Sequence, residues 1–255
     1  MRLYQFWTDE EIAFLTAYYD TMSVKEMMLS LNRSKVSIQG MVRRLGLESG
    51  RTKATQVINH SYFSRIRTAE QAYILGLLAT DGTVDSTGKI RLTLHEQDRG
   101  LVEWVRDRIA PLSPVHPQPG RQAILLQITT PQMAADLSGF GVVPNKTSSL
   151  EWPSSLDNEW YRPFLLGAFD GDGSLHYNKR ILAKSTLRWA LYGAEAFLST
   201  AAIVIEQATG IKPYGPRRMH TERKGHAIEL AAKKAETVDY WLNQDRMGWH
   251  RKHLQ

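Results

Sequence analysis

Two aspartates in matching sequence surroundings are the residues of this chain best suited to chemistry. Asp81 lies near the end of the segment YILGLLATDG, and Asp172 lies near the end of the segment FLLGAFDGDG, 91 positions later. In each segment an apolar run with a glycine in its middle leads to an Asp-Gly pair. Such a repeat predicts two similar structural units, each of which ends an apolar helix with a carboxylate. Packed side by side, two such helices would bring both carboxylates together into a metal site.

The middle glycines, Gly76 and Gly167, favour that packing, because residues without side chains let two helix backbones approach closely. The C-terminal end of a helix also carries partial negative charge. Two carboxylates at two such ends repel each other unless a cation lies between them. Oxygen ligands from carboxylates and carbonyls favour Mg²⁺ or Mn²⁺ over zinc. We therefore expect Asp81 and Asp172 to bind a divalent metal, and phosphodiester hydrolysis is the chemistry that such a site suits.

The composition is compatible with a nucleic-acid partner and excludes several other classes of function. The chain has 255 residues, with 32 Lys and Arg against 26 Asp and Glu, which gives a formal net charge of +6. Positive charge suits a polyanion such as DNA. The absence of Cys excludes disulfides, thiolate catalysis and Cys-ligated zinc, and fits an intracellular protein, cytoplasmic or associated with the nucleoid if the source is prokaryotic. No run approaches 18 apolar residues, so we expect no membrane partner.

Residues 1–47 predict a small all-α domain of three short helices. The helix starts are marked by capping side chains, namely Thr8, Ser23 and Ser34. The third helix carries three basic residues that could bind DNA: Lys35, Arg43 and Arg44. Three helices entered by the stretch FWTDEE resemble a Myb-like helix-turn-helix domain. The alternative is a packing domain with a solvated basic face, and in either case we interpret residues 48–66 as a basic linker.

From residue 67 onward, helix and strand signals alternate in the same order twice. Helices are predicted over 68–81, 98–109, 131–139, 161–172, 194–209 and 235–244, with Gly82 as a left-handed cap after the first. Strands are predicted over 89–95, 121–129, 175–180, 187–192, 214–220 and 225–231, and prolines at 111–119 predict turns. Each repeat, 67–153 and 154–255, is therefore interpreted as helix, two strands, helix, two strands, helix. The expected fold class is α+β with two pseudo-symmetric repeats after an all-α domain.

The two motifs, ILGLLATDG and LLGAFDGDG, resemble the signature motifs of the LAGLIDADG homing endonucleases in their single-chain, two-motif form. The stretch GFGVVPNKTSSLEWP also resembles that family, and the resemblance covers roughly residues 68–255. It implies two antiparallel sheets that form a saddle on double-stranded DNA. It also implies metal-dependent cleavage of both strands at Asp81 and Asp172, with Thr80 and Gly171 lending carbonyl oxygens to metal. A duplicated chain of this kind would act as a monomer without a protein partner.

The resemblance also implies a basic residue beside each acid. Lys233, or its neighbour Lys234, is the candidate in the second repeat, whereas the matching stretch of the first repeat, ITTPQM, holds no lysine. That difference would allow unequal cutting of the two strands. Lys146, in the NKT stretch, could bind phosphate or lie in solvent. Candidates for reading DNA lie on the strand face opposite the apolar one, and they are Arg91, Thr93, His95, Gln127, Arg188, Tyr192, Arg217 and Arg218.

Two further acidic residues, Asp170 and Glu229, have expected positions and roles in this interpretation. Asp170 stands where the first motif has Ala79, and we expect it to face away from the helix interface as a supporting residue. Glu229 falls on the DNA-reading face, where it could accept a hydrogen bond from a cytosine amine.

Two other functions suit the same scaffold: a transcription regulator that binds DNA without cutting it, and a maturase that assists RNA splicing. Acids at both motifs argue against the regulator, because bare carboxylates repel phosphates when no metal is bound.

Overall fold

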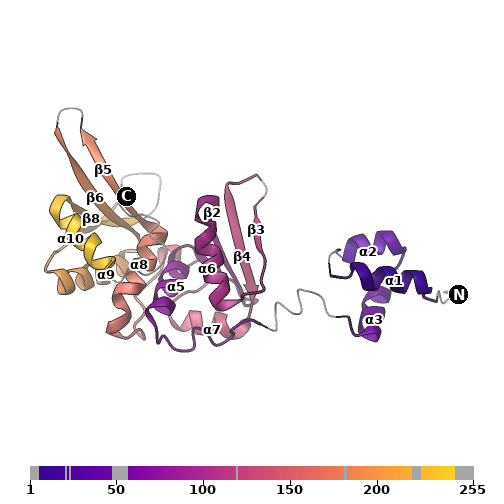
Figure 1. Ribbon diagram of the computed structural model, residues 1–255. Helices are drawn as coiled ribbons and strands as arrows, with labels where there is room; N and C mark the ends of the chain where they lie inside the picture. Colours follow the sequence, from indigo (N-terminus) through magenta and orange to yellow (C-terminus); the bar gives the residue numbers. More distant parts are fainter. Residues whose placement is uncertain are drawn as a thin grey trace. The chain divides into compact units, whose positions relative to one another are not determined.

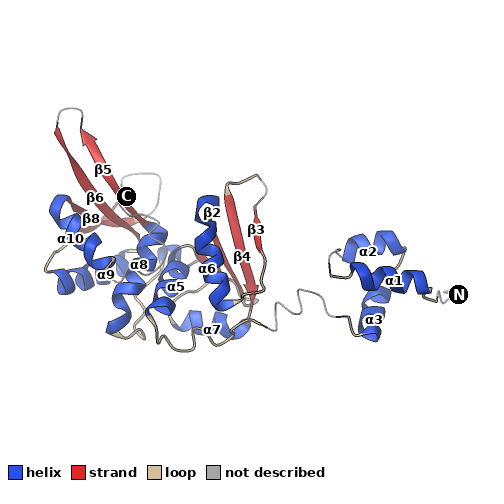
Figure 2. Cartoon of the chain, viewed as in Figure 1, coloured by secondary structure: helices blue, strands red, loops and turns tan. Residues whose placement is uncertain are grey.

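The computed structural model describes residues 6–20, 22, 24–47, 57–118, 120–180, 183–219 and 225–244. They fall into two compact units, whose elements are traced in Figures 1 and 2. One unit holds the three N-terminal helices together with Ala110–Ser113, and the other holds Asn59–Ile109 and the chain from Pro114 onward. Among the described residues, no helix is both long enough and apolar enough to cross a membrane.

The N-terminal unit consists of three short helices: α1 (Asp9–Tyr18), α2 (Val24–Leu31) and α3 (Lys35–Leu45). Thr8 caps α1 through a reciprocal capping box with Glu11, and Ser34 caps α3 by accepting a backbone hydrogen bond from its first turn. Gly46 ends α3 with a φ of 62°, a left-handed conformation that glycine adopts without steric cost. Ser23, expected to cap α2, lies outside the described residues. The structure therefore contains the all-α unit that the capping pattern predicts.

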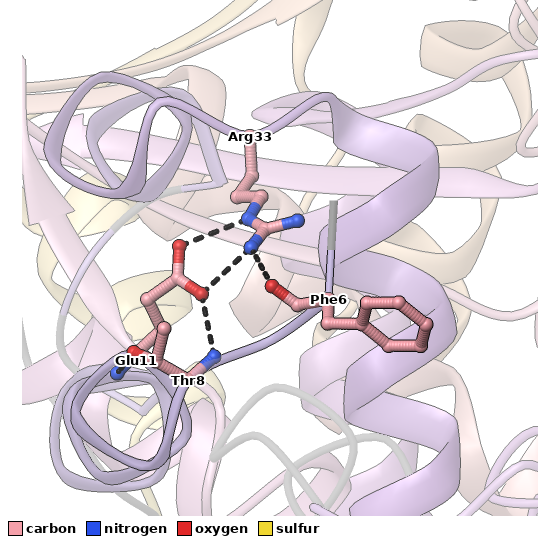
Figure 3. Close-up of polar contacts among 4 residues, drawn as sticks. All are labelled: Phe6, Thr8, Glu11 and Arg33. Atoms are coloured by element: carbon pink, nitrogen blue, oxygen red, sulfur yellow. Dashed lines mark hydrogen bonds and ion pairs between the residues drawn. The ribbon is translucent and has the colours of Figure 1, made fainter. Parts of the chain in front are cut away.

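A small apolar core and one buried ion pair hold these helices together. The core draws on all three helices, with Leu15, Met27, Ile38, Met41 and Val42. Arg33, only 8% exposed, joins the turn before α3 to the start of α1. Its guanidinium donates to both carboxylate oxygens of Glu11, at 2.9 and 2.7 Å, and to the carbonyl of Phe6 at 2.6 Å (Figure 3). Because a two-pronged Arg–carboxylate contact fixes orientation, α3 has a defined place against α1.

The second unit contains two repeats of one element order. The first repeat runs α5 (Ala69–Thr80), β1 (Gly82–Val84), β2 (Lys89–His95), α6 (Arg99–Ile109), β3 (Val115–Pro117), β4 (Ala123–Thr129) and α7 (Pro131–Gly139). The second runs α8 (Tyr161–Asp172), β5 (Gly173–Arg180), β6 (Ala183–Gly193), α9 (Glu195–Thr209), β7 (Tyr214–Arg218), β8 (His226–Ala231) and α10 (Ala232–Leu242). Each repeat is helix, two strands, helix, two strands, helix, so the predicted α+β class with two similar repeats is confirmed.

Each repeat forms one four-stranded antiparallel sheet. The strand orders are β1-β2-β4-β3 and β5-β6-β8-β7, so corresponding strands occupy corresponding places. In β2, Ile90, Leu92 and Leu94 are buried, whereas the alternate residues Arg91 and Thr93 are half-buried on the other face. Helix α6 packs on β2 and β4, and helices α9 and α10 pack on the second sheet. The apolar faces of both sheets are therefore covered by helices, as the alternation predicts.

Helices α5 and α8 pack against each other in the middle of this unit (Figure 1). Gly76 and Gly167 lie at the contact, as predicted. A Cβ atom on Gly76 would lie 2.8 Å from the amide nitrogen of Ala168 and still closer to the carbonyl of Phe164. A Cβ atom on Gly167 would lie 2.9 Å from the amide nitrogen of Leu77. Since side-chain atoms do not approach a backbone this closely, only glycine permits the observed spacing of the two helices.

Two local predictions about this unit are wrong. Gly82 begins strand β1 rather than forming a left-handed cap; it is required there because a Cβ atom would lie 2.5 Å from the carbonyl oxygen of Leu78. Residues 115–117, expected in a turn, form the edge strand β3. Pro117 is compatible with that strand, because a proline at a sheet edge need not donate a ladder hydrogen bond.

The linker expected over residues 48–66 is also partly wrong. Residues 48–56 lie outside the described residues, but the chain from Asn59 onward packs into the second unit. Phe63 and Ile66 are buried, at 0% and 5% exposed. The Asn59 amide donates to the Ile109 carbonyl at 2.9 Å. Apolar residues at irregular spacing give no periodic signal of a helix or strand. The sequence of this packed segment was therefore interpreted as a linker.

Candidate active site

The predicted pair of acids lies at the adjoining C-terminal ends of α5 and α8. Asp81 is the C-cap of α5; its amide donates to the Leu77 carbonyl at 2.9 Å, and the residue is half-buried. Asp172 is the last residue of α8 and is exposed. A Cβ atom on Gly171 would lie 3.5 Å from Cγ of Asp81 and would overlap the side chain of Thr80. The glycine before Asp172 therefore brings the end of α8 against the acid of α5.

A cationic residue, Lys146, lies beside both acids. Its ammonium donates a hydrogen bond to the carbonyl of Gly82, and the residue is only 6% exposed. Burial lowers the pKa of Lys146, and the negative charges of Asp172 and Asp81 act in the opposite direction. Of the two alternatives for Lys146, exposure to solvent is therefore wrong, and phosphate binding stays a prediction. Its ammonium supplies a counter-charge to the acidic pair.

A cleft of about 530 Å³ opens beside Asp81 and Lys146. Its walls come from the end of α5, from strand β1 with the turn that follows it, and from the loop at residues 143–146. Asp85 and Arg91 also line it, so the cleft is lined by two carboxylates and two cationic side chains. Thr80 turns its hydroxyl back to its own helix, donating to the carbonyls of residues 76 and 77 at 3.2 and 3.1 Å. The Thr80 hydroxyl is thus held against the backbone of its own helix.

The oxygen ligands at the helix ends suit an open Mg²⁺ site better than a metal site formed by protein side chains alone. Within the part of the chain that the structure describes, no cluster of three or more His, Cys, Asp or Glu side chains could hold a metal. Mg²⁺ commonly binds through one or two carboxylates, keeps several waters and takes substrate phosphates as further ligands. Asp81 and Asp172 provide two carboxylates in this manner. The residues thus fit a divalent ion whose coordination is completed by water and phosphate.

Asp170 is buried at the contact between α5 and α8, which corrects the prediction that it faces away. The hydroxyl of Tyr73 donates to Oδ2 of Asp170 at 2.6 Å, and the two residues are 1% and 2% exposed. The ring of Trp104 packs edge-on against Tyr73, with 5.8 Å between ring centroids. A carboxylate can be buried when a hydrogen-bond donor reaches it, and the long tyrosine side chain provides one across the helix interface. Asp170 therefore joins the two helices two residues before Asp172.

On the first sheet, Arg91 and Gln127 face each other across β2 and β4. Nε of Arg91 donates to Oε1 of Gln127 at 2.9 Å, and its Nη2 lies 3.4 Å from Oδ2 of Asp85. Thr93 is half-buried and His95 is exposed farther along the same strand. The four predicted residues Arg91, Thr93, His95 and Gln127 thus share the polar side of this sheet. Two acceptors hold the Arg91 side chain in a defined orientation.

On the second sheet, Arg217 is anchored by an acid. Its Nε and Nη2 atoms lie 2.8 and 2.7 Å from Oε2 of Glu229. The charge of Glu229 is therefore balanced by Arg217 within the protein. Arg188 and Arg218 are exposed on β6 and β7, and Tyr192 is half-buried on β6. Their predicted contact with DNA stays a prediction.

Four predicted site residues remain, and they belong to helices other than α5 and α8. Lys233 is exposed in the first turn of α10, and its role at an acid stays a prediction. Lys35, Arg43 and Arg44 belong to α3 of the N-terminal unit, where all three are exposed.

Sequence reasoning missed the position of Lys146 and the Tyr73–Asp170 pair. One available signal for Lys146 was the preceding Asn145, a residue type that favours turns; it has a φ of 57° in the structure and redirects the loop. No signal was available for the second pair, because 97 positions separate Tyr73 from Asp170.

Among known proteins, only solved structures show similarity to this chain. No family model matches the sequence, and no curated protein matches it. The meganuclease I-SmaMI bound to uncleaveable DNA is 11% identical, with a TM-score of 0.48 over 69% of this chain and 83% of that chain. The LAGLIDADG homing endonuclease I-LtrWI bound to target DNA is 11% identical, with a TM-score of 0.46 over 76% and 87% of the two chains. I-SmaMI was also solved on uncleaved DNA with calcium ions, at 10% identity, a TM-score of 0.47 and 71% and 85% coverage.

Proposed function

We propose that this chain is a metal-dependent endonuclease that hydrolyses phosphodiester bonds in double-stranded DNA. The observation that carries the proposal is that the helix ends bearing Asp81 and Asp172 adjoin each other, with Lys146 near both acids. The duplicated motif, which resembles that of LAGLIDADG homing endonucleases, supports the same function from the sequence. The polar side chains on both sheets supply groups suited to base edges, such as Arg91 with Gln127.

The roles of the residues follow from their chemistry. When bound, a divalent ion would lower the pKa of an attacking water and stabilise the leaving oxygen. Asp81 and Asp172 would hold Mg²⁺ or Mn²⁺ with their carboxylates, and the carbonyls of Thr80 and Gly171 are proposed as further ligands. We propose that the ammonium of Lys146, which lines the cleft, donates to a phosphate oxygen that enters it. Lys233 is proposed as the basic residue of the second repeat, and the duplicated chain is proposed to act as a monomer.

Incubation with a randomised duplex library and Mg²⁺, followed by sequencing of the cut ends, tests this function. Cut ends with short, uniform 3′ overhangs are expected. Asp81→Asn and Asp172→Asn should each lower the cutting rate at least about a hundredfold, because a bound metal supplies several kcal/mol of transition-state stabilisation. Both variants should still bind the selected duplex. An uncut library, or variants that cut like the parent chain, would contradict the proposal.

One observation favours a second candidate, a regulator that binds DNA without cutting it. The ammonium of Lys146 offsets part of the negative charge of the two acids, which lowers the repulsion between the carboxylates and phosphates when no metal is bound. A regulator should show no cutting, and its DNA affinity should be the same with Mg²⁺ and with a chelator. The asparagine variants should then bind as well as the parent chain or better. Competition by structured RNA that exceeds competition by duplex DNA would instead indicate the maturase function.

A further inference from the structure

The helix pair α5 and α8 carries a polar contact that its internal repeat does not copy. The hydroxyl of Tyr73 on α5 donates to Oδ2 of Asp170 on α8 at 2.6 Å. The repeats are 91 positions apart, and the positions that correspond to these two residues hold Phe164 and Ala79. Phe164 and Ala79 are also buried, at 1% and 2% exposed. One set of corresponding positions is therefore polar and the other is apolar.

The packing of the two helices does not by itself require the polar pair. Burying a carboxylate costs free energy, and apolar replacements of a buried polar pair are often neutral or stabilising. Phe164 and Ala79 show that these helices accommodate apolar side chains at the corresponding positions. Buried polar groups can instead fix one arrangement of two packed elements. A role in orientation would account for Tyr73 and Asp170.

Tyr73 is itself held by residues of the first repeat. Its ring packs edge-on against Trp104 of α6, with 5.8 Å between ring centroids. The guanidinium of Arg108 lies 3.9 Å from the centroid of the Trp104 ring and forms an ion pair with Glu70 of α5. Helix α6 packs on β2 and β4 of the first sheet. Asp170, a residue of the second repeat, is thus connected through Tyr73 and Trp104 to the helix that covers the first sheet.

The contact from Tyr73 acts on the last turn of α8, which carries Asp172. Asp170 lies two residues before Asp172, and Gly171 between them packs against the side chain of Thr80. Helix α5 therefore contacts two successive residues of this turn, one by a hydrogen bond and one by close packing. A rotation of the turn about the helix axis would disturb both contacts. A turn held in this way gives the exposed carboxylate of Asp172 a defined position.

We infer that Tyr73 and Asp170 are positioning residues that fix Asp172 relative to Asp81. Ala79 has no side-chain oxygen, so the corresponding hydrogen bond cannot form before Asp81. The consequence for cutting rests on the proposed function: if each acid serves one DNA strand, loss of the pair slows one strand more than the other. In this role Tyr73 and Asp170 act through Asp172 and do not touch DNA or metal.

The double variant Tyr73→Phe/Asp170→Ala tests the inference, because it installs the residue types of the corresponding positions. Cleavage of a supercoiled plasmid that carries a selected target, with Mg²⁺, separates the first cut from the second. The ratio of the two rates should rise about tenfold above that of the parent chain, since loss of an outer contact to a metal ligand commonly costs that much. The midpoint of thermal unfolding should not fall. A slower cut of one strand without loss of stability separates positioning from damage to the fold.

Two further variants serve as rescue and control. Asp170→Asn keeps an oxygen that accepts the tyrosine hydrogen bond, so it should retain the strand ratio of the parent chain. Tyr161→Phe also removes a hydroxyl from an aromatic ring that packs edge-on against a tryptophan, Trp152. Because Tyr161 begins α8, at the end opposite Asp172, this variant should change neither the strand ratio nor the midpoint of unfolding.

Calorimetric titration with Ca²⁺ alone gives a measurement that needs no cutting. The Kd for Ca²⁺ should be about tenfold higher in the double variant than in the parent chain. If the parent chain binds Ca²⁺ but cuts no DNA, the proposed function fails and the Kd alone decides the inference. The inference is overturned if the parent chain binds no Ca²⁺, if the Kd or an observed strand ratio is the same in the double variant, or if Asp170→Asn is as impaired as the double variant.

Discussion

At the scale of single residues, Lys146 changes how the acidic pair should be understood. Two carboxylates at two helix C-termini concentrate negative charge, and a buried ammonium beside them offsets part of it. The pair is therefore not a bare acidic spot whose only possible counter-charge is a metal. A divalent ion that binds there does so in competition with, or in addition to, an internal cation.

Replacing Lys146 by Met should reveal this competition. The change keeps an apolar stem but removes the ammonium, so Asp81 and Asp172 lose a counter-charge and the carbonyl of Gly82 loses a donor. We expect the free energy of unfolding in a chelator to fall by about 1–3 kcal/mol, the usual cost of removing one partner of a buried polar contact. Millimolar Ca²⁺ should then raise the midpoint of thermal unfolding more in Lys146→Met than in the parent chain. Lys25→Met, at an exposed position of α2 in the N-terminal unit, should behave like the parent. Equal calcium shifts in all three proteins would contradict this role of Lys146.

Asp85, on the wall of the cleft, offers a second test at a single residue. Its pKa is lowered from 3.8 to about 2, chiefly because the Thr87 hydroxyl donates to it at 2.6 Å, with further hydrogen bonds from the backbone of Lys89 and Thr87. A folded-state pKa below the unfolded value gives stability above about pH 4 that is lost as the pH falls toward 2. Thr87→Val should raise the pKa of Asp85 and make stability less dependent on pH in this window. Carbon NMR titration of the carboxyl group measures this, with Thr83→Val as the control that leaves the pKa unchanged.

At the scale of elements, sequence patterns predicted the structure well where the signal was local and periodic. The helix expected over 161–172 is observed as α8 with the same bounds, and the alternation in residues 89–95 matches β2. Prediction failed where tertiary packing decides. The edge strand β3 exists because it pairs with β4. The segment that leads to Phe63 is held at Asn59 by a hydrogen bond to Ile109, which lies 50 positions away.

The candidate site shows the same division between local and long-range information. The duplicated motif was sufficient to predict Asp81, Asp172 and the two interface glycines, since each is marked by its neighbours in the chain. The position of Lys146 depends on a loop that folds back over 64 positions to Gly82. The Tyr73–Asp170 contact depends on how two helices are rotated against each other, which residue types alone do not specify.

The close contact between α5 and α8 leads to a prediction about helix packing. Gly76→Ala and Gly167→Ala each place a Cβ atom into the backbone of the opposite helix. We expect each to lower the free energy of unfolding by about 3 kcal/mol or more, because overpacking against a backbone cannot be relieved by a rotamer change. Denaturant unfolding measures the effect. Gly139→Ala is the control, because Gly139 is the exposed last residue of α7 and a Cβ atom there would meet nothing within 4 Å. It should change the free energy of unfolding by less than about 0.5 kcal/mol. An interface variant as stable as this control would contradict the close packing of the two helices.

At the scale of the whole second unit, the two repeats share an element order but are not equal. Strands β5 and β6 have 8 and 11 residues, whereas β1 and β2 have 3 and 7. Strand β6 pairs with β8 only from Arg188 onward, so its earlier part pairs with β5 alone. Figure 1 shows this hairpin extending beyond β8. The second sheet therefore presents a longer surface than the first.

This inequality leads to a prediction about the DNA site, if the sheets bind DNA as proposed. Strand β6 is four residues longer than β2, which adds about 13 Å at about 3.3 Å per residue, or roughly four base pairs. We expect the half of the site read by the second sheet to be longer by about that amount, so the target should not be a palindrome. Hydroxyl-radical footprinting on a selected duplex with Ca²⁺ measures both halves. Arg188→Ala should weaken protection in the longer half alone, because its exposed side chain lies on the second sheet, whereas two halves of equal length would contradict the assignment of the sheets to DNA.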